Sequence, residues 1–258
     1  MGSGCWGIET RPQMPEDVTQ SYQKGQALAR AGKVRQAAEV WTAAGRNHNY
    51  QTWLGAWFMF RAATLLSKSR RWSAANGAYA ESIARAGQGL PAVTAQIFRA
   101  WASTYRQRND WVNSAKYCLR SIVESQKVGP QTLSIADALD EMGTIFLQRR
   151  NLVEAEAYFR QACNIREKLA PDSLAIAQSL SNLGTVIRYP RGGDLATAEK
   201  YYDRALAIQN RLAPGGLDVA STLTNLGIIA WQRGDLVKSE KDLHQALDIG
   251  VEPLKGSA

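Results

Sequence analysis

The chain has 258 residues, of which 45% are hydrophobic and 21% are charged, so it is too apolar for a disordered protein. The longest uncharged apolar run, residues 53–60, is far shorter than the roughly 20 residues that a membrane span needs, and we expect no membrane partner. Three cysteines with no CxxC pair exclude a disulfide framework, which favours a cytoplasmic location.

The formal net charge of +8 is unevenly distributed along the chain. Residues 1–130 carry 17 Lys/Arg and 7 Asp/Glu, whereas residues 131–258 carry 14 and 16. The two halves therefore present different surfaces to partners.

Residues 1–18 precede the repeat pattern, and we expect them to form a flexible or loosely packed leader. Cys5 lies in this leader, but Trp6 stands where an acylation signal needs Ser or Thr. Residues 19–250 are predicted to form one array of helix pairs, and residues 251–258 a flexible tail.

An internal repeat is clearest near the C-terminus. The segment 176–184 returns as 219–227, and residues 135–143 are an earlier copy. The glycines that end the three segments are separated by 41 and 43 residues, a period typical of stacked supersecondary units.

The same register extends to the N-terminus through a small residue in each second helix. These anchor residues are Ala37, Ala75, Ala115, Ala155, Ala198 and Ser239. A large apolar residue follows each anchor by four positions: Trp41, Tyr79, Leu119, Phe159, Tyr202 and Leu243. A small residue in the first helix precedes each anchor by twelve or fourteen positions: Gly25, Ala63, Ser103, Gly143, Gly184 and Gly227. We expect the anchors to be buried where two helices cross, with the large residue filling the gap to the next pair.

These positions resemble the tetratricopeptide repeat (TPR) family, whose pattern is Leu-Gly in the first helix and Ala-x-x-x-Phe in the second. The 40- to 43-residue spacing and the Ala205–Ile208 ending are similar to the long repeats of kinesin light chain and many bacterial proteins. The resemblance implies an all-α, right-handed solenoid of about six helix pairs. The expected repeats lie near 19–50, 54–92, 94–130, 134–172, 175–214 and 218–249.

Residues for catalysis are sparse. The two histidines, His48 and His244, have no Cys, Asp or Ser partner at a suitable spacing, and we interpret both as surface residues. No metal-ligand cluster or phosphate-binding glycine loop is present, so we expect no enzyme activity, metal or cofactor. The stretch 191–194 is glycine-rich, and we interpret it as a longer turn rather than a contact loop.

The TPR resemblance also implies a binding face. In family members that hold extended peptides, an asparagine two residues before the glycine bonds the ligand backbone, and Asn182 and Asn225 match it. Glu141 occupies that position one repeat earlier. Nearby residues expected to sort ligand side chains are Asp140, Arg188 and Trp231. The alternative is that both asparagines only satisfy backbone groups between repeats.

Two further features lie in the first half. Trp53, Trp57, Phe58 and Phe60 could form a stacking platform, although spacing favours core packing. A basic set could serve an acidic partner or nucleic acid, although a solvated turn is the simpler interpretation. It comprises Arg61, Lys68, Arg70, Arg71, Arg106 and Arg108.

The sequence therefore predicts a non-catalytic scaffold that binds a peptide or protein segment in the concave groove of the solenoid. A second hypothesis is the recognition arm of a larger enzyme, since Trp-rich pairs followed by regular long repeats resemble the N-terminal arms of bacterial CHAT-type, caspase-like proteases. Nucleic-acid binding through the basic half is a weaker alternative. Self-association is expected at the last pair, where Leu243, Leu247 and Ile249 have no following helix to cover them.

Overall fold

The computed structural model describes residues 16–47, 52–87, 89–189 and 193–255. Cys5 and most of the predicted leader lie outside these residues, as do His48 and residues 190–192 of the glycine-rich turn. The first helix begins at Glu16, and the last helix continues to Lys255, into the segment expected to be a tail.

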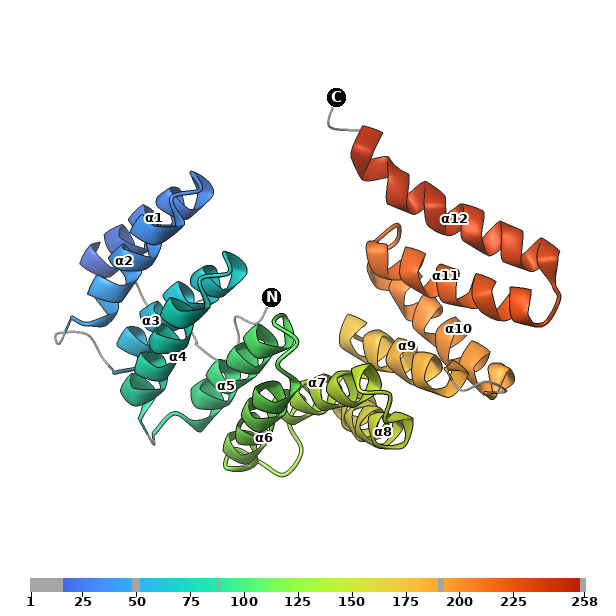
Figure 1. Cartoon of the computed structure of the whole chain (residues 1–258), viewed down its shortest axis with the longest axis horizontal. Helices are drawn as coiled ribbons and strands as arrows, with labels where there is room; N and C mark the ends of the chain where they lie inside the picture. The colour runs from blue at the N-terminus through green and yellow to red at the C-terminus, as the bar shows by residue number, and fades with distance from the viewer. Residues whose placement is uncertain (1–15, 48–51, 88, 190–192, 256–258) are drawn as a thin grey trace. The chain divides into compact units, whose positions relative to one another are not determined.

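All regular structure in the described part of the chain is α-helical (Figure 1). The helices are α1 (Glu16–Arg30), α2 (Val34–Gly45), α3 (Thr52–Lys68), α4 (Trp72–Ala86), α5 (Pro91–Arg106), α6 (Trp111–Gln126), α7 (Leu133–Gln148), α8 (Leu152–Leu169), α9 (Leu174–Arg188), α10 (Leu195–Leu212), α11 (Leu217–Gln232) and α12 (Leu236–Lys255). Consecutive helices pair as α1–α2, α3–α4 and so on to α11–α12, which confirms the predicted all-α fold of six pairs.

The chain folds as two compact units, residues 1–138 and residues 139–258, and the boundary falls within α7. Stacked rings dominate the core of the first unit: Trp101 lies 5.6 Å from Tyr79 and 4.3 Å from Tyr117 between ring centroids. Trp57 and Phe58 are buried in the same unit, so they contribute to packing as the spacing predicted.

The turns within five of the pairs share one backbone conformation. A residue just after the first helix has a left-handed conformation, with φ between 57° and 81°: Gly32, Arg70, Asn109, Arg150 and Gly234. The next N–H then reaches back to the last turn of the helix, as from Arg71 N to Leu66 O at 2.9 Å. In three pairs an aspartate caps the second helix, and Asp110, Asp194 and Asp235 each accept a backbone N–H at 3.0–3.1 Å.

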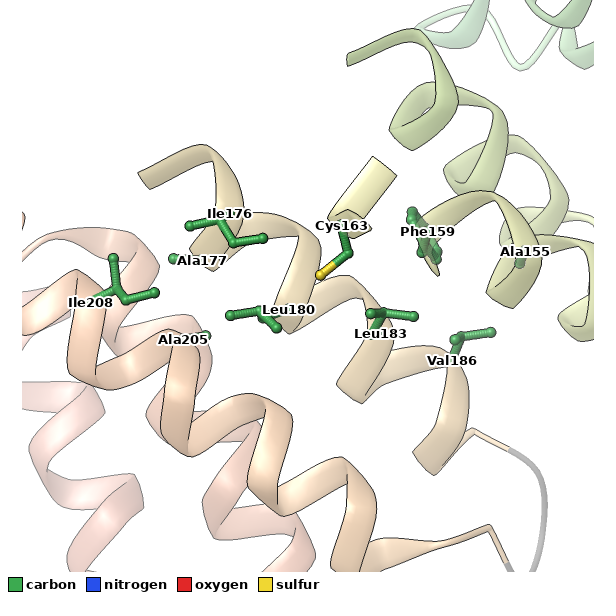
Figure 2. Close-up of a cluster of buried hydrophobic side chains, with 10 residues drawn as sticks. All are labelled: Ala155, Phe159, Cys163, Ile176, Ala177, Leu180, Leu183, Val186, Ala205 and Ile208. Carbon is green, nitrogen blue, oxygen red and sulfur yellow. The ribbon is translucent and has the colours of Figure 1, made fainter. Parts of the chain in front are cut away.

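A buried cluster in the second unit shows how neighbouring pairs pack (Figure 2). Phe159 and Cys163 from α8 face Leu180 and Leu183 of α9, and Ile208 comes from α10. All are less than 10% exposed. α9 thus packs both against α8 of the preceding pair and against α10 of its own pair. Each repeat therefore depends on its neighbours for a buried core.

Where the first helix has a glycine at the crossing, this glycine provides the contact surface for the large residue of its own pair. A Cβ on Gly143 would lie 2.6 Å from the Phe159 ring, and one on Gly184 would lie 2.9 Å from the Tyr202 ring. Trp41 lies over Gly25 in the same way. Phe159 also clusters with residues of α9, and Tyr202 with Leu226 and Ile229 of α11, so these large residues fill both the space within their own pair and the gap to the next pair.

The predicted register was also wrong by one residue in the third pair. Ser114, and not Ala115, is fully buried, and its hydroxyl donates to the carbonyl oxygen of Ala102 at 3.0 Å. Four residues on, Cys118 is buried while Leu119 is 50% exposed. The small residue of the first helix is accordingly Ala102 rather than Ser103. The other five anchors are buried as expected.

Candidate functional site

Asn182 on α9 and Asn225 on α11 occupy equivalent positions in successive pairs of the second unit. Each lies two residues before the glycine that faces the partner helix, so its side chain is directed away from the helix crossing. Both side chains are half-buried. The two side chains thus occupy one repeated position on two first helices, and their contact with a ligand stays a prediction.

The hydrogen bonds of the two amides leave capacity for a further partner. Asn182 accepts from Gln178 at 3.1 Å through Oδ1, and no described residue accepts from its Nδ2. Asn225 donates to the Ser221 carbonyl at 3.0 Å and lies 3.5 Å from Arg188 Nη2 through Oδ1. A side-chain amide has two N–H donors and two acceptor lone pairs, so each asparagine keeps at least one of both kinds.

α9 and α11 are neighbours on this face. The Ser181 and Thr222 hydroxyls are 3.4 Å apart, and Arg188 on α9 reaches Asn225 on α11. Arg188 and Trp231 again occupy equivalent positions, four residues after the two glycines. Trp231 is 64% exposed, an unusual exposure for so large an apolar side chain. We call Asn182, Arg188, Asn225 and Trp231 the α9–α11 face.

Arg188 is a half-buried cation with no carboxylate partner among the described residues. Its Nε is buried without a hydrogen bond. Burial raises the pKa of the neighbouring Tyr202, while bonds from Thr185 and Arg188 oppose that rise. The guanidinium is therefore available to an anionic group that approaches from solvent.

Asp140 is engaged within the fold. Its carboxylate forms an ion pair with Arg166 and accepts from the Ser179 hydroxyl at 3.0 Å, which ties α7 to α8 and α9. The side chains of Arg166 and Asp140 are only 5% and 14% exposed. We therefore leave Asp140 out of the ligand-contacting set, whereas Glu141 beside it is half-buried on α7.

The predicted basic residues do not share one environment. Arg61 is half-buried, with its guanidinium carbon 5.2 Å from the Trp41 ring and 5.5 Å from the Tyr22 ring. Arg108 lies 5.8 Å from the Trp72 ring, and Arg106 is half-buried. The exposed members are Lys68, Arg70, Arg71 and Arg108, which lie at the end of α3 and in the turns after α3 and α5.

The described residues offer little for covalent or metal chemistry. Cys118 and Cys163 are buried free thiols, and burial raises the pKa of Cys163 to about 11. His244 is exposed, with Nε2 3.8 Å from Glu240. Within the residues that the structure describes, no group of three His, Cys, Asp or Glu side chains could hold a metal, and no helix is long and apolar enough to cross a membrane.

Sequence reasoning missed a groove between α2 and α4 in the first unit. It holds an open cavity of about 580 Å³ whose lining includes the buried Ala38, Leu66 and Ala78 and the exposed Ala74 and Gly77. In the sequence, this groove is marked only by Ala38 and Ala74, small residues next to the anchors of two successive second helices. Of the residues that the sequence left uncovered on the last pair, Leu243 and Leu247 are exposed on α12, whereas Ile249 packs against the cluster of Val219, Leu223 and Ala246. Self-association through α12 stays a prediction.

The repeat register and the packing of the pairs identify the family when they are compared with known proteins. The sequence model of the tetratricopeptide repeat matches residues 93–168 and 175–250. The chain belongs to the tetratricopeptide repeat family. Members of this family stack helix-pair repeats and generally serve protein–protein interaction.

Solved structures share the fold of this TPR chain. A crystal structure of BtubC (BKLC) from P. vanneervenii is 22% identical, covers 93% of this chain and 91% of that one, and has a TM-score of 0.70. PilF from Pseudomonas aeruginosa is 13% identical, with 94% of each chain covered and a TM-score of 0.61. YrrB, described as a TPR protein with an unusual peptide-binding site, is 16% identical over 83% of this chain and 94% of that one, with a TM-score of 0.51. At these identities the likeness establishes the fold alone. No curated protein matches the sequence.

Proposed function

We propose that this TPR chain is a non-catalytic scaffold that holds an extended peptide segment on the α9–α11 face. The observation that carries the proposal is the pair of half-buried amides, Asn182 and Asn225, repeated on adjacent first helices with hydrogen-bonding capacity left over. YrrB, a structure with the same fold, is described as binding a peptide, which supports this class of ligand.

Binding to the backbone of a peptide ligand would explain why both positions have a side-chain amide. A peptide group presents one N–H and one carbonyl, and an asparagine can donate to one and accept from the other whatever the ligand's side chains are. Because the two asparagines belong to adjacent repeats, they would hold separate peptide groups of one extended segment.

Side-chain selectivity would come from the neighbouring residues. Arg188 offers an uncompensated guanidinium, and Trp231 offers a largely exposed ring. The α9–α11 face should therefore prefer a segment with a carboxylate near one asparagine and an apolar side chain near Trp231.

Selection from a random 15-residue peptide library on the full chain tests the proposal. We expect enriched peptides whose affinity falls several-fold for Asn182→Ala or Asn225→Ala, since one neutral hydrogen bond contributes about 0.5–1.5 kcal/mol. The double variant should lose about the sum if the contacts are independent. Asn164→Ala, the same change on the exposed surface of α8, is the matched control and should bind normally.

The thermal unfolding midpoint separates a ligand role from a structural one. Both asparagine variants should unfold close to the midpoint of the parent protein, because their side chains are only half-buried and point away from the helix crossing. A clear drop in midpoint with unchanged peptide affinity would make the asparagines structural and refute the proposal.

A further inference from the structure

The second helices of the first two pairs leave a groove between them, which we call the α2–α4 groove. It holds a cavity of about 580 Å³. Its lining comprises Arg35, Ala38, Glu39, Thr42, Ala43 and Arg46 from α2, Leu66 from α3, and Arg71, Ala74, Gly77, Ala78 and Glu81 from α4 and the residue before it. It lies in the first unit and on second helices, so it is separate from the α9–α11 face.

Comparison with the α10–α12 seam of the second unit explains why the space exists. There Glu199, the residue after the anchor of α10, bonds at 2.5 Å to Lys238, the residue before the anchor of α12. The equivalent residues in the first unit are Ala38 and Ala74, which have no side chains long enough to meet. A Cβ on Gly77 would touch nothing within 4 Å. At this position, the seam that an ion pair fills in the second unit is thus open in the first.

The two ends of the α2–α4 groove differ in charge. Arg46 and Glu81 form a bidentate pair at 2.9 and 3.0 Å that bridges α2 and α4 at one end, and the bond from Arg46 lowers the pKa of Glu81. At the other end Arg71 is exposed, and a second cavity of about 440 Å³ adjoins it with Lys33 in its lining. Neither Arg71 nor Lys33 has an acidic partner among the described residues.

We propose that the α2–α4 groove binds an acidic peptide segment in extended conformation, with a carboxylate at Arg71 and Lys33 and small apolar side chains against the buried Ala38, Leu66 and Ala78. The bridge from Arg46 to Glu81 closes the other end. The helical rise over some ten residues gives a groove about 15 Å long, which accommodates roughly five extended residues.

The lining favours a peptide over nucleic acid. The cavity walls include Leu66 and several alanines but no aromatic ring on which a base could stack. The cations at the open end suit a single carboxylate, and the apolar floor suits side chains that lose water on binding. Since Arg35 already pairs with Glu39 at 2.9 Å, Arg71 and Lys33 carry the excess positive charge.

The test is an NMR titration of the ¹⁵N-labelled full chain with two pools of capped pentapeptides. One pool carries Asp or Glu at a fixed position and random residues elsewhere, and the other replaces the acid by Asn or Gln. We expect the acidic pool to shift the backbone amides of groove residues such as Ala74 and Gly77. The neutral pool should bind at least five-fold more weakly. No shift with either pool, or equal shifts with both, would overturn the proposal.

Two pairs of variants locate the site. Gly77→Leu fills the open space and should reduce affinity for the acidic pool more than ten-fold, whereas Gly77→Ala should change it less than two-fold. Both replacements favour the helix, so folding is retained. Arg71→Gln should weaken binding several-fold, whereas Arg70→Gln, next to it but outside the lining, should not. Binding that tolerates Gly77→Leu would place the ligand elsewhere and refute the groove. A ten-nucleotide oligothymidylate that shifts the same amides equally well would refute the peptide.

Discussion

Replacing Gly184 by alanine should destabilise the fifth helix pair, because the new methyl group has no room. Its Cβ would lie 2.9 Å from two carbons of the Tyr202 ring. The ring cannot easily move, since Tyr202 is fully buried and its hydroxyl is 2.8 Å from that of Thr185. Forcing an extra methyl group into a packed contact costs about 1–3 kcal/mol.

Gly77 provides the matched control within the same chain. It also lies in a helix, but a Cβ there meets nothing within 4 Å. Glycine to alanine in an open helical position stabilises by about 0.5–1 kcal/mol, because the unfolded chain loses freedom. Both substitutions carry this backbone gain, so the difference between them isolates the contact with Tyr202. We expect that difference to be about 1–3 kcal/mol.

Urea unfolding followed by circular dichroism measures both variants. Gly77→Ala should shift the midpoint upward, and Gly184→Ala should shift it downward or leave it near the parent value. Equal shifts for both variants, within about 0.5 kcal/mol, would refute the reasoning that the glycine exists to seat the tyrosine ring.

Three other substitutions test separate features of the fold. Arg166→Met should lower the free energy of unfolding by about 3 kcal/mol in urea, because the nearly buried carboxylate of Asp140 would lose its charged partner. Arg70→Gly should raise it by about 0.5–1 kcal/mol, since Arg70 has a φ of 58° that glycine adopts without strain. Glu199→Gln should flatten the loss of thermal stability in acid. The hydrogen bond from Lys238 lowers the pKa of Glu199, so this contribution is present above the unfolded pKa and is lost as the pH falls through the folded pKa.

Each of these expectations has a clear contrary result. Unchanged stability in Arg166→Met would mean that the buried ion pair adds no net stability. A destabilised Arg70→Gly would mean that the arginine side chain makes a stabilising contact. Identical stability–pH curves for Glu199→Gln and the parent protein would mean that the ion pair with Lys238 is fully screened in solution.

The architecture could be predicted from the sequence because the packing constraint is local. Two helices cross closely only where one has a very small residue, so Gly143, Gly184 and Gly227 fix the period of the later repeats. The register of the third pair was predicted wrongly because Ser114 and Ala115 are both small and adjacent. Alanine occupies the anchor in most of the other pairs, so Ala115 matched the pattern better than Ser114. The capping aspartate was the better guide, since Asp110 stands before Trp111 as Asp194 stands before Leu195.

The candidate sites were less predictable, because each depends on which side chains meet across helices. The position of Asn182 and Asn225 followed from the repeat, but the engagement of Asp140 by Arg166 joins residues 26 positions apart and has no local signature. The α2–α4 groove depends on small residues in two helices at once, and alanine is too common in helices to signal a cavity on its own. The groove becomes evident when the α2–α4 seam is compared with the α10–α12 seam, because alanines line the first where charged residues meet across the second.

The central claim is that Asn182 and Asn225 together hold one extended peptide. The most direct measurement follows the side-chain amide ¹⁵N–¹H resonances of these two residues while a library-selected peptide is added to the full chain. Both resonances should shift in the same titration and give one dissociation constant, while the amide of Asn164 stays in place. If neither resonance moves although the peptide binds, the ligand lies elsewhere, and the assignment of the α9–α11 face is contradicted.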